Sequence, residues 1–505
     1  MRPSRLLLLI VSAAALANLA FAVGRRLAYP YDLEWMEGGM LVHTLRLVQG
    51  EPIYAEPSAR FVSFAYTPLY PIVLWLLAPA AGVGYLPARA VSAAAFALAL
   101  VVAYAFVRRA GGSRAVALGA AAIPAAAFGP TGAWYDLARI DSLFLALTAA
   151  AVAVGWWKRN APAGPLAAGV LMTAAFFAKQ TALPFAAALG LALLVARPRA
   201  AAVYAATLAG LGAALLAWAH VATGGWFWTY VFGLHRHHPF AVVDAALVTP
   251  ARLLLLLAPG LALLGLARRR RTPDLLYAAW IALTSLVASA LGAGTEWSYH
   301  NALIPGVYFA AIAVGAVAAA TEDRRPVLAP LLLAASVACA PGGLLALAGG
   351  AAASPRLALP LGYDLRPFLP SPADRQRGDA LVAHLAAAGG DVFVPDHSFY
   401  PHLAGKPTHL HAMNVADLEG AGMRVPRDLV EKMRGKEFGL VVVDREDAED
   451  GADDPATRAR REEDAVGLVP GLSKNYRLAE RIEGPRVYSG GRFVPCCVLV
   501  PREGP

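Results

Sequence analysis

Long hydrophobic runs alternate with short polar segments along most of this chain. One such run is "LLLLIVSAAALANLAFAV" at residues 6–23. A helix of roughly 20 apolar residues crosses the ~30 Å hydrocarbon core of a membrane, and the runs are of about this length. The pattern predicts a polytopic α-helical membrane protein, and the spacing of the runs predicts about eleven transmembrane helices.

Basic residues collect in every second polar segment, so that two hydrophobic runs separate one basic cluster from the next. By the positive-inside rule, segments rich in Arg and Lys stay in the cytoplasm. The first run follows Arg2 and Arg5 and therefore leads outward. The later clusters are Arg108 and Arg109, Lys158 and Arg159, Arg197 and Arg199, Arg268–Arg271, and Arg324 and Arg325. The segments between these clusters are predicted on the outer face, namely residues 24–87, 133–141, 176–181, 224–240 and 294–301.

One apolar segment does not fit this alternation. Counting "AYTPLYPIVLWLLAPAAG", residues 65–82, as a full span would place Arg108 and Arg109 outside the cell. Pro68 and Pro71 also weaken it as a regular span, although membrane helices tolerate proline. We expect a juxtamembrane or re-entrant helix on the outer side.

The chain changes character near residue 350, where charged residues and prolines become frequent. Residues 373–389 are typical of an amphipathic helix. The segments "DVFVP", "FGLVVVD" and "CCVLVP" are typical of short buried strands. We therefore predict a transmembrane domain at residues 1–349 and a small extracytoplasmic α/β domain at residues 350–505.

The composition agrees with a membrane protein. Of the 505 residues, 58% are hydrophobic and 16% are charged, whereas about 25% are charged in soluble proteins. The net charge of +9 comes mostly from arginines, which outside the last third of the chain lie between the runs, so it does not indicate nucleic-acid binding. The neighbouring Cys496 and Cys497 are not expected to pair, because adjacent cysteines rarely suit disulfide geometry.

Three carboxylates, Asp32, Glu34 and Glu37, follow the first hydrophobic run in "YPYDLEWMEGGM" at residues 29–40. If a helix starts here, its first turns tolerate negative charge, and Glu34 and Glu37 share a face. A carboxylate beside a membrane can act as a general base toward an acceptor hydroxyl or amine. Several together can hold a divalent cation. The alternative is a solvated acidic loop.

Two further ionisable residues stand at the ends of hydrophobic runs. Asp141 follows Arg139 in "LARIDSLFLAL" and could also be a simple helix N-cap. Lys179 is the only charged residue between Arg159 and Arg197. Ionisable groups in such surroundings are costly and usually functional, and a cation at the outer interface suits a phosphate. A snorkelling lysine beside a short loop is the alternative.

Histidines gather in three other segments. In "LHRHHPF", no acid or cysteine stands at metal-ligand spacing, so anion contact by Arg236 and a histidine such as His238 is favoured over zinc. His300 opens a later span, where an aromatic belt with helix caps is the alternative. The tail histidines are expected to be surface or packing residues: His397, His402, His409 and His411.

The order of these features resembles the GT-C-type membrane glycosyltransferases, and most closely the family 39 relatives of the protein O-mannosyltransferases and of the lipid A aminoarabinose transferase. The likeness runs over roughly residues 5–320. It rests on the acidic first loop followed by "GEPIY", on the Pro-rich "AYTPLYPIVLWLLA", and on "ARID", "AKQT" and "SYHNALIP". The family usually has adjacent Asp and Glu in its first loop, whereas Met36 precedes Glu37 here.

The resemblance implies that the protein is an inverting glycosyltransferase of the bacterial inner membrane and serves the cell envelope. It would move a sugar from a polyprenyl-phosphate-linked donor to a lipid, glycan or protein acceptor on the outer face. A first-loop carboxylate would be the catalytic base, Asp141 with Arg139 would position the acceptor or a metal, and Lys179 would hold the lipid phosphate. Arg236, His238 and His300 are further candidates for substrate binding. A divalent metal ion, if one is used, would be held among Asp32, Glu37 and Asp141.

Two other functions stay open at this stage. A transporter or flippase of lipid-linked glycans could use the same charged residues as a passage, but such proteins often show internal repeats and discontinuous helices at mid-membrane depth. No repeat is visible here, and the acids collect at one face. A non-catalytic envelope assembly protein would bind a partner through its outer domain, and its first loop would be dispensable.

Overall fold

The computed structural model describes residues 2–266, 272–295, 298–342, 362–446, 472–490 and 493–503. This part of the chain is mostly helical, and six of its helical segments are long and apolar enough to cross a membrane. The prediction of a multi-pass α-helical membrane protein is confirmed. The predicted cytoplasmic cluster Arg268–Arg271 lies outside the described residues.

The helices of the bundle differ in length. The long ones are α1 (Pro3–Leu27), α4 (Tyr85–Arg109), α9 (Pro198–Ala222), α11 (Thr249–Leu266, preceded by the π-helical turn η3, Asp244–Val248), α12 (Pro273–Gly294) and α13 (Ile304–Glu322, preceded by the turn η4, His300–Leu303). The shorter apolar ones are α3 (Leu69–Ala81), α5 (Arg114–Ala126), α6 (Asp141–Trp157), α7 (Ala163–Ala178), α8 (Ala182–Ala196) and α14 (Leu328–Cys339).

The predicted count of eleven spans stays a prediction. Reaching it without α3 requires five helices of only 12 to 17 residues, which are shorter than the roughly 20 residues of a regular span. The segment predicted as a juxtamembrane helix forms α3, which has 13 residues and packs against α2 (Glu37–Val48).

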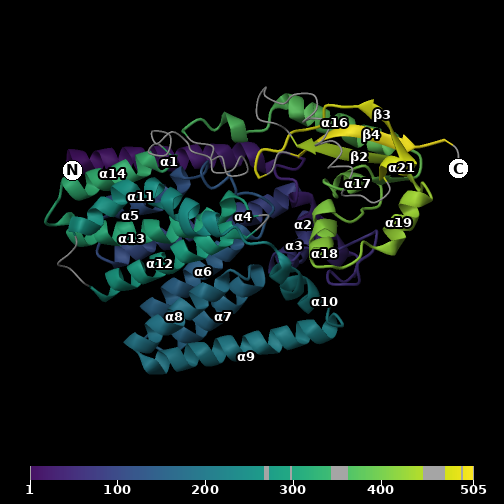
Figure 1. The fold of residues 1–505 in the computed structure, drawn as a ribbon. Coiled ribbons are helices and arrows are strands. Elements are labelled where there is room, and N and C mark those ends of the chain that lie inside the picture. The colour runs from purple at the N-terminus through teal and green to yellow at the C-terminus, as the bar shows by residue number, and fades with distance from the viewer. Residues whose placement is uncertain are drawn as a thin grey trace.

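Helix α13 lies at the centre of the bundle, and α9 lies at its edge (Figure 1). Of the apolar stretch within His300–Glu322, which contains α13, 89% is buried inside the protein. The corresponding share for α9 is 11%. Small residues let neighbouring helices approach α13 closely: a Cβ at Gly315 would stand 2.5 Å from the Cβ of Ala120 on α5. Close approach of this kind replaces the hydrophobic drive that helices lack inside lipid.

The last part of the chain forms a four-stranded sheet with short helices. Its strands are β1 (Asp391–Phe393), β2 (Phe438–Glu446), β3 (Tyr476–Arg481) and β4 (Phe493–Pro501). Their order is β1-β2-β4-β3, and only the β1–β2 pair is parallel. The three segments predicted as strands are β1, β2 and β4. The accompanying helices are η6 (Arg366–Phe368), α16 (Pro372–Ala387), α17 (Tyr400–Leu403), α18 (Ala412–Gly420), α19 (Arg427–Arg434) and α21 (Leu472–Asn475).

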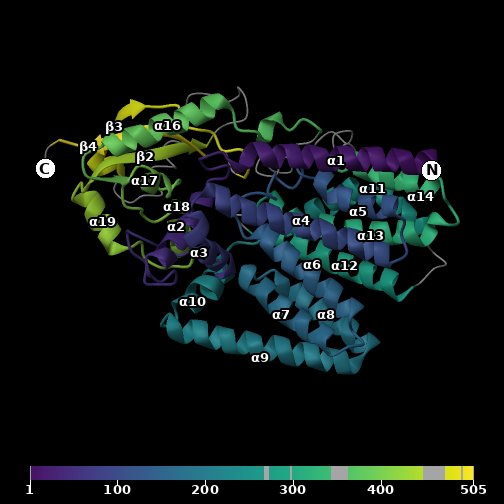
Figure 2. The same ribbon diagram turned by 180° about the vertical axis from the view of Figure 1, so that it is seen from behind.

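The sheet and its helices cover one end of the helical bundle, opposite the N-terminus (Figures 1 and 2). At the same end lie α2, α3 and α10 (Trp226–Trp228). The π-helical turn η1 (Thr229–Leu234) contacts α10 and α18, and the turn η2 (His235–His237) follows it. Within β4, Cys496 and Cys497 are joined by a disulfide, so the expectation that these neighbours would not pair is wrong.

Candidate active site

The three first-loop carboxylates are buried, with 1%, 0% and 0% of Asp32, Glu34 and Glu37 exposed. The alternative of a solvated acidic loop is therefore wrong. The helix that follows, α2, begins at Glu37, so Asp32 and Glu34 precede it and do not lie in its first turns. Each carboxylate has its own basic partner, from a different part of the chain.

Glu37 is held by Arg89 of α4 through two parallel hydrogen bonds. Arg89 Nε donates to Glu37 Oε1 at 2.9 Å, and Nη2 donates to Oε2 at 2.6 Å. The backbone N–H groups of Leu33 and Ala138 each donate to one of the same oxygens at 2.7 Å. Burial opposes ionisation of Glu37, but Arg89 and these N–H groups outweigh it and lower its pKa. We interpret Glu37 as a structural ion-pair partner rather than a base.

Glu34 is less completely paired. Its Oε2 accepts a hydrogen bond from Arg139 Nη1 at 2.8 Å, while Oε1 has no hydrogen-bond partner among the described residues. Burial raises the pKa of Glu34 to about 7, against the opposing effect of Arg139. A carboxylate with a free oxygen and a pKa near neutrality has the properties of a general base.

Asp32 belongs to a buried chain of three side chains. Its Oδ2 lies 2.8 Å from Nδ1 of His397, and Nε2 of the same ring lies 2.7 Å from Oδ2 of Asp444 on β2. Burial opposes the charged form of His397, but the two carboxylates outweigh it and raise its pKa. Burial raises the pKa of Asp32, although His397 acts against it. His397 was expected to be a surface or packing residue, and the structure shows it bridging two acids instead.

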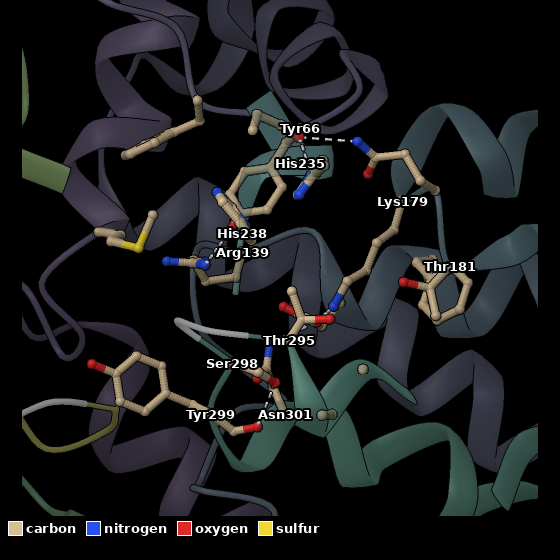
Figure 3. Close-up of a pocket in the computed structure, with 18 of the residues that line it drawn as sticks. Tyr66, Arg139, Lys179, Thr181, His235, His238, Thr295, Ser298, Tyr299 and Asn301 are labelled. Carbon is tan, nitrogen blue, oxygen red and sulfur yellow. Dashed lines mark hydrogen bonds and ion pairs between the residues drawn. The ribbon is translucent and has the colours of Figure 1, made fainter. Parts of the chain in front are cut away.

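A cavity of about 610 Å³ opens next to these residues. Its wall comes from the first loop, the segment before α6, the end of α7, the turns η1 and η2, the turn η4 and α18. Figure 3 shows Lys179 extending from one side and Arg139 and His238 from the other. The charged residues and histidines along the wall are Arg139, Asp141, Lys179, His235, Arg236, His238 and Asp417.

Asp141 and Lys179 form an ion pair inside this cavity. Lys179 Nζ lies 2.6 Å from Asp141 Oδ1, which also accepts from Asn301 Nδ2 at 3.1 Å. Trp134 Nε1 donates to the other oxygen at 2.9 Å. Asp141 is thus more than a helix cap, and Lys179 is more than a snorkelling lysine, because each reaches across from a different helix end.

Arg139 connects the first loop to the cavity. Its Nη1 binds Glu34, its Nη2 donates to the hydroxyl of Tyr66 at 2.8 Å, and its Nε has no hydrogen-bond partner in the described part of the chain. The guanidinium also stands 5.5 Å from the ring centre of Trp134. The Nε atom is itself buried, so Arg139 meets the cavity through the rest of its side chain.

The structure brings most of the predicted binding residues together. Arg139, Asp141, Lys179, Arg236 and His238 line the cavity, whereas His300 is not among its described lining residues. His238 Nε2 also lies 3.1 Å from Oδ1 of Asp417 on α18.

Several residues of the site were missed in the sequence. Arg89 and Asp417 were not singled out, and neither was Asp444. Arg89 could have been found, because an arginine near the start of a hydrophobic run is costly unless it has a partner. Asp417 and Asp444 carry no local signal, since both lie in the tail and reach the site only through the fold.

A metal site receives no support from the geometry. Asp32, Glu37 and Asp141 have separate basic partners in His397, Arg89 and Lys179. The described residues contain no group of three or more His, Cys, Asp or Glu that could hold a metal ion.

Comparisons with known proteins give matches by structure alone. No protein-family model and no curated sequence matches the chain. ArnT from Cupriavidus metallidurans, the lipid A aminoarabinose transferase, matches in its structure bound to undecaprenyl phosphate with a TM-score of 0.57 and 14% identity, over 96% of this chain and 97% of that one. Its apo structure matches with a TM-score of 0.57 and 15% identity, with the same coverage.

A second enzyme has a similar arrangement. The archaeal oligosaccharyltransferase AglB from Archaeoglobus fulgidus, in complex with an inhibitory peptide and a dolichol-phosphate, matches with a TM-score of 0.50 and 12% identity. The match covers 86% of this chain and 69% of that one. At identities this low, the likeness shows the fold.

Proposed function

Because the chain has the fold of the GT-C-type glycosyltransferases, we propose that it is an integral membrane glycosyltransferase. It would transfer a sugar from a polyprenyl-phosphate-linked donor to an acceptor at the outer face of the inner membrane. The observation that carries this proposal is the cavity, which is lined by the cationic groups of Lys179 and Arg139. Arg139 is paired behind the cavity wall with the buried carboxylate of Glu34, whose Oε1 has no hydrogen-bond partner among the described residues.

The donor phosphate would bind to Lys179 and Arg139. An ammonium group has three N–H donors. Lys179 Nζ donates to Asp141 Oδ1, and Lys179 also lines the cavity. Lys179 can therefore bind a phosphate oxygen without releasing Asp141. Arg139 adds the positive charge of its guanidinium group at the cavity wall. These cations would stabilise the charge that develops on the phosphate as the glycosidic bond breaks.

Glu34 would act as the base. As the acceptor oxygen or nitrogen attacks the anomeric carbon, its proton passes to Oε1 of Glu34, and the bond from that carbon to the phosphate oxygen breaks. The products are the glycosylated acceptor and polyprenyl phosphate. Direct displacement of this kind inverts the configuration at the anomeric carbon.

The proposal also assigns the two predicted domains to sides of the membrane. Residues 350–505 would form an extracytoplasmic domain on the transmembrane domain at residues 1–349. Supporting this, Asp32 of the predicted outer loop contacts His397 of the tail, so the two segments share one side.

The pH dependence should report Glu34. We expect kcat/KM to rise about tenfold per pH unit below about 7 and to level off above it, because the base must be ionised. The pKa of Glu34 is higher in the folded chain than its ordinary value of 4.5. The folded state therefore keeps this proton longer, and Glu34 makes the free energy of unfolding fall as the pH rises from 4.5 to about 7. A pH–rate profile in which kcat/KM does not rise toward pH 7 would contradict the assignment of Glu34 as the base.

Changing Lys179 to Ala should weaken binding of undecaprenyl phosphate, used as the probe, by about ten- to a hundredfold, since a hydrogen bond to a charged group contributes about 1.5–3 kcal/mol. Lys179→Arg keeps the charge and should restore most of the affinity. Lys158→Ala, which alters a lysine outside the cavity lining, is the matched control. Binding to Lys179→Ala as tight as to the unaltered protein would remove the phosphate role.

The function itself is tested by comparing envelope lipids and glycans from cells with and without the protein by mass spectrometry. We expect one glycosylated species to disappear and its lipid-linked donor to accumulate. An unchanged set of glycosylated species would contradict the proposal. Accumulation of donor on the cytoplasmic side alone would favour a flippase instead.

A further inference from the structure

The backbone around Glu34 is held by the C-terminal part of the chain. The carbonyl oxygen of Leu33 accepts hydrogen bonds from the N–H groups of Tyr488 and Ser489, at 2.8 and 2.9 Å. Two residues earlier, the hydroxyl of Tyr31 donates to a carboxylate oxygen of Asp379 on α16. The loop is therefore fixed on its N-terminal side by residues that lie more than 340 positions away.

The other side of Glu34 is fixed in the same way. The carbonyl oxygen of Trp35 lies 3.3 Å from Nε2 of His411. The indole ring of Trp35 stacks on Phe493 of β4, with 4.1 Å between ring centres. A Cβ at Gly38 would stand 3.0 Å from the Cβ of Phe399, so the start of α2 also lies directly against the C-terminal part.

The charged centre of this contact is His397. It is 1% exposed, and each of its ring nitrogens faces a carboxylate, that of Asp32 in the loop and that of Asp444 in the sheet. A histidine that donates from both nitrogens is an imidazolium. The other oxygen of Asp32 accepts the N–H of Gly38 at 3.0 Å, so the same carboxylate also fixes the start of α2.

The Glu34 side chain is enclosed between Arg139 and the C-terminal part, since a Cβ at Gly490 would stand 3.1 Å from Glu34 Cγ. It binds Arg139, which lines the cavity, while residues on both sides of Glu34 bind the C-terminal part. The position of its carboxylate therefore depends on the loop conformation that the C-terminal part imposes.

We propose that His397 is a positioning residue for the transfer reaction, and that the C-terminal part of the chain sets the geometry of the first loop that holds the base Glu34. This inference rests on the proposed function. Misplacing a reacting group by about 1 Å can lower a rate about a hundredfold. Loss of the His397 bridge should therefore lower kcat and leave donor binding nearly unchanged, because Lys179 comes from another segment and pairs with Asp141 rather than with the first loop.

The test uses the full-length protein in lipid nanodiscs and compares His397→Ala with His409→Ala. His409 is an apt control, because it is also buried and also joins the tail to the first loop, through Asp391 and the carbonyl oxygen of Ala59. Hydrogen exchange would be followed by mass spectrometry in the peptide covering residues 31–41, whose Leu33 and Gly38 amides bind Glu37 and Asp32.

We expect exchange in this peptide to rise at least tenfold in His397→Ala and to stay near the unaltered value in His409→Ala. We expect kcat to fall at least tenfold in His397→Ala only, with the affinity for undecaprenyl phosphate within twofold. Equal exchange in the two variants, or full turnover by folded His397→Ala, would overturn the inference.

Two further measurements keep the outcome decisive. If His397→Ala does not fold, Asp444→Asn removes one charge of the bridge and keeps its shape, and it should loosen the same peptide to a smaller degree; no loosening would overturn the inference. If the unaltered protein transfers no sugar, the proposed function fails by itself, and the exchange experiment still decides whether His397 positions the loop.

Discussion

Replacing Glu34 with Gln is expected to lower kcat by about 10²- to 10⁴-fold, the usual contribution of a general base. Gln keeps the size of the side chain and can still accept the hydrogen bond from Arg139 Nη1, but its amide cannot take up the proton of the acceptor. The folded yield and the affinity for undecaprenyl phosphate should stay close to those of the unaltered protein. Turnover in nanodiscs, measured with the donor identified from the envelope lipids, checks this expectation.

The matched controls are the two other acids of the loop. Asp32→Asn should lower kcat less than Glu34→Gln does, because Asp32 acts through the His397 bridge. Glu37→Gln should chiefly lower stability, since both oxygens of Glu37 hold Arg89 and backbone N–H groups. Full activity of Glu34→Gln would refute the assignment of the base, and activity of all three variants would refute a carboxylate base in this loop.

Replacing Arg89 with Ala is expected to cause the largest loss of stability. Arg89 is 0% exposed, and besides Glu37 it binds the backbone carbonyl oxygens of Arg26, Tyr29 and Tyr31. Breaking a buried ion pair on one side costs about 3–5 kcal/mol, because the other charge stays buried without a partner. Folded proteins are stable by only about 5–15 kcal/mol, so thermal unfolding should start at a clearly lower temperature and the yield should fall.

A double variant separates the ion pair from the packing. Arg89→Ala combined with Glu37→Ala removes both charges, and it should be more stable than Arg89→Ala alone. Arg109→Ala, in the last turn of the same helix, is the control for helix α4. An Arg89→Ala protein as stable as the unaltered one would show that the pair contributes nothing to the fold.

Much of the helical architecture could be read from the sequence. A hydrophobic run is favourable in lipid whatever the rest of the chain does. The positions of the runs in the sequence therefore agree with those of α1, α4 and the later helices. Lys179 could be recognised in the same way, because a charge among apolar residues is costly wherever the chain folds. The order of motifs also led to the GT-C-type fold, although no single motif was specific.

The roles of the three acids could not be read in this way. Asp32, Glu34 and Glu37 lie within six positions of one another, and all three carry a carboxylate. They differ only because His397, Arg139 and Arg89 reach them from residues 365, 105 and 52 positions away. Local patterns carry no information about such partners.

The sequence by itself determined where helices form, because hydrophobicity and periodicity are properties of the segment that carries them. It also determined which polar segments are candidates for chemistry, since ionisable residues beside apolar runs are few. Only the tertiary structure decided which carboxylate keeps a free oxygen and which are neutralised. The reason is electrostatic: in a buried site, the pKa and hydrogen bonding of an acid depend on the charges packed against it, and those come from distant parts of the chain.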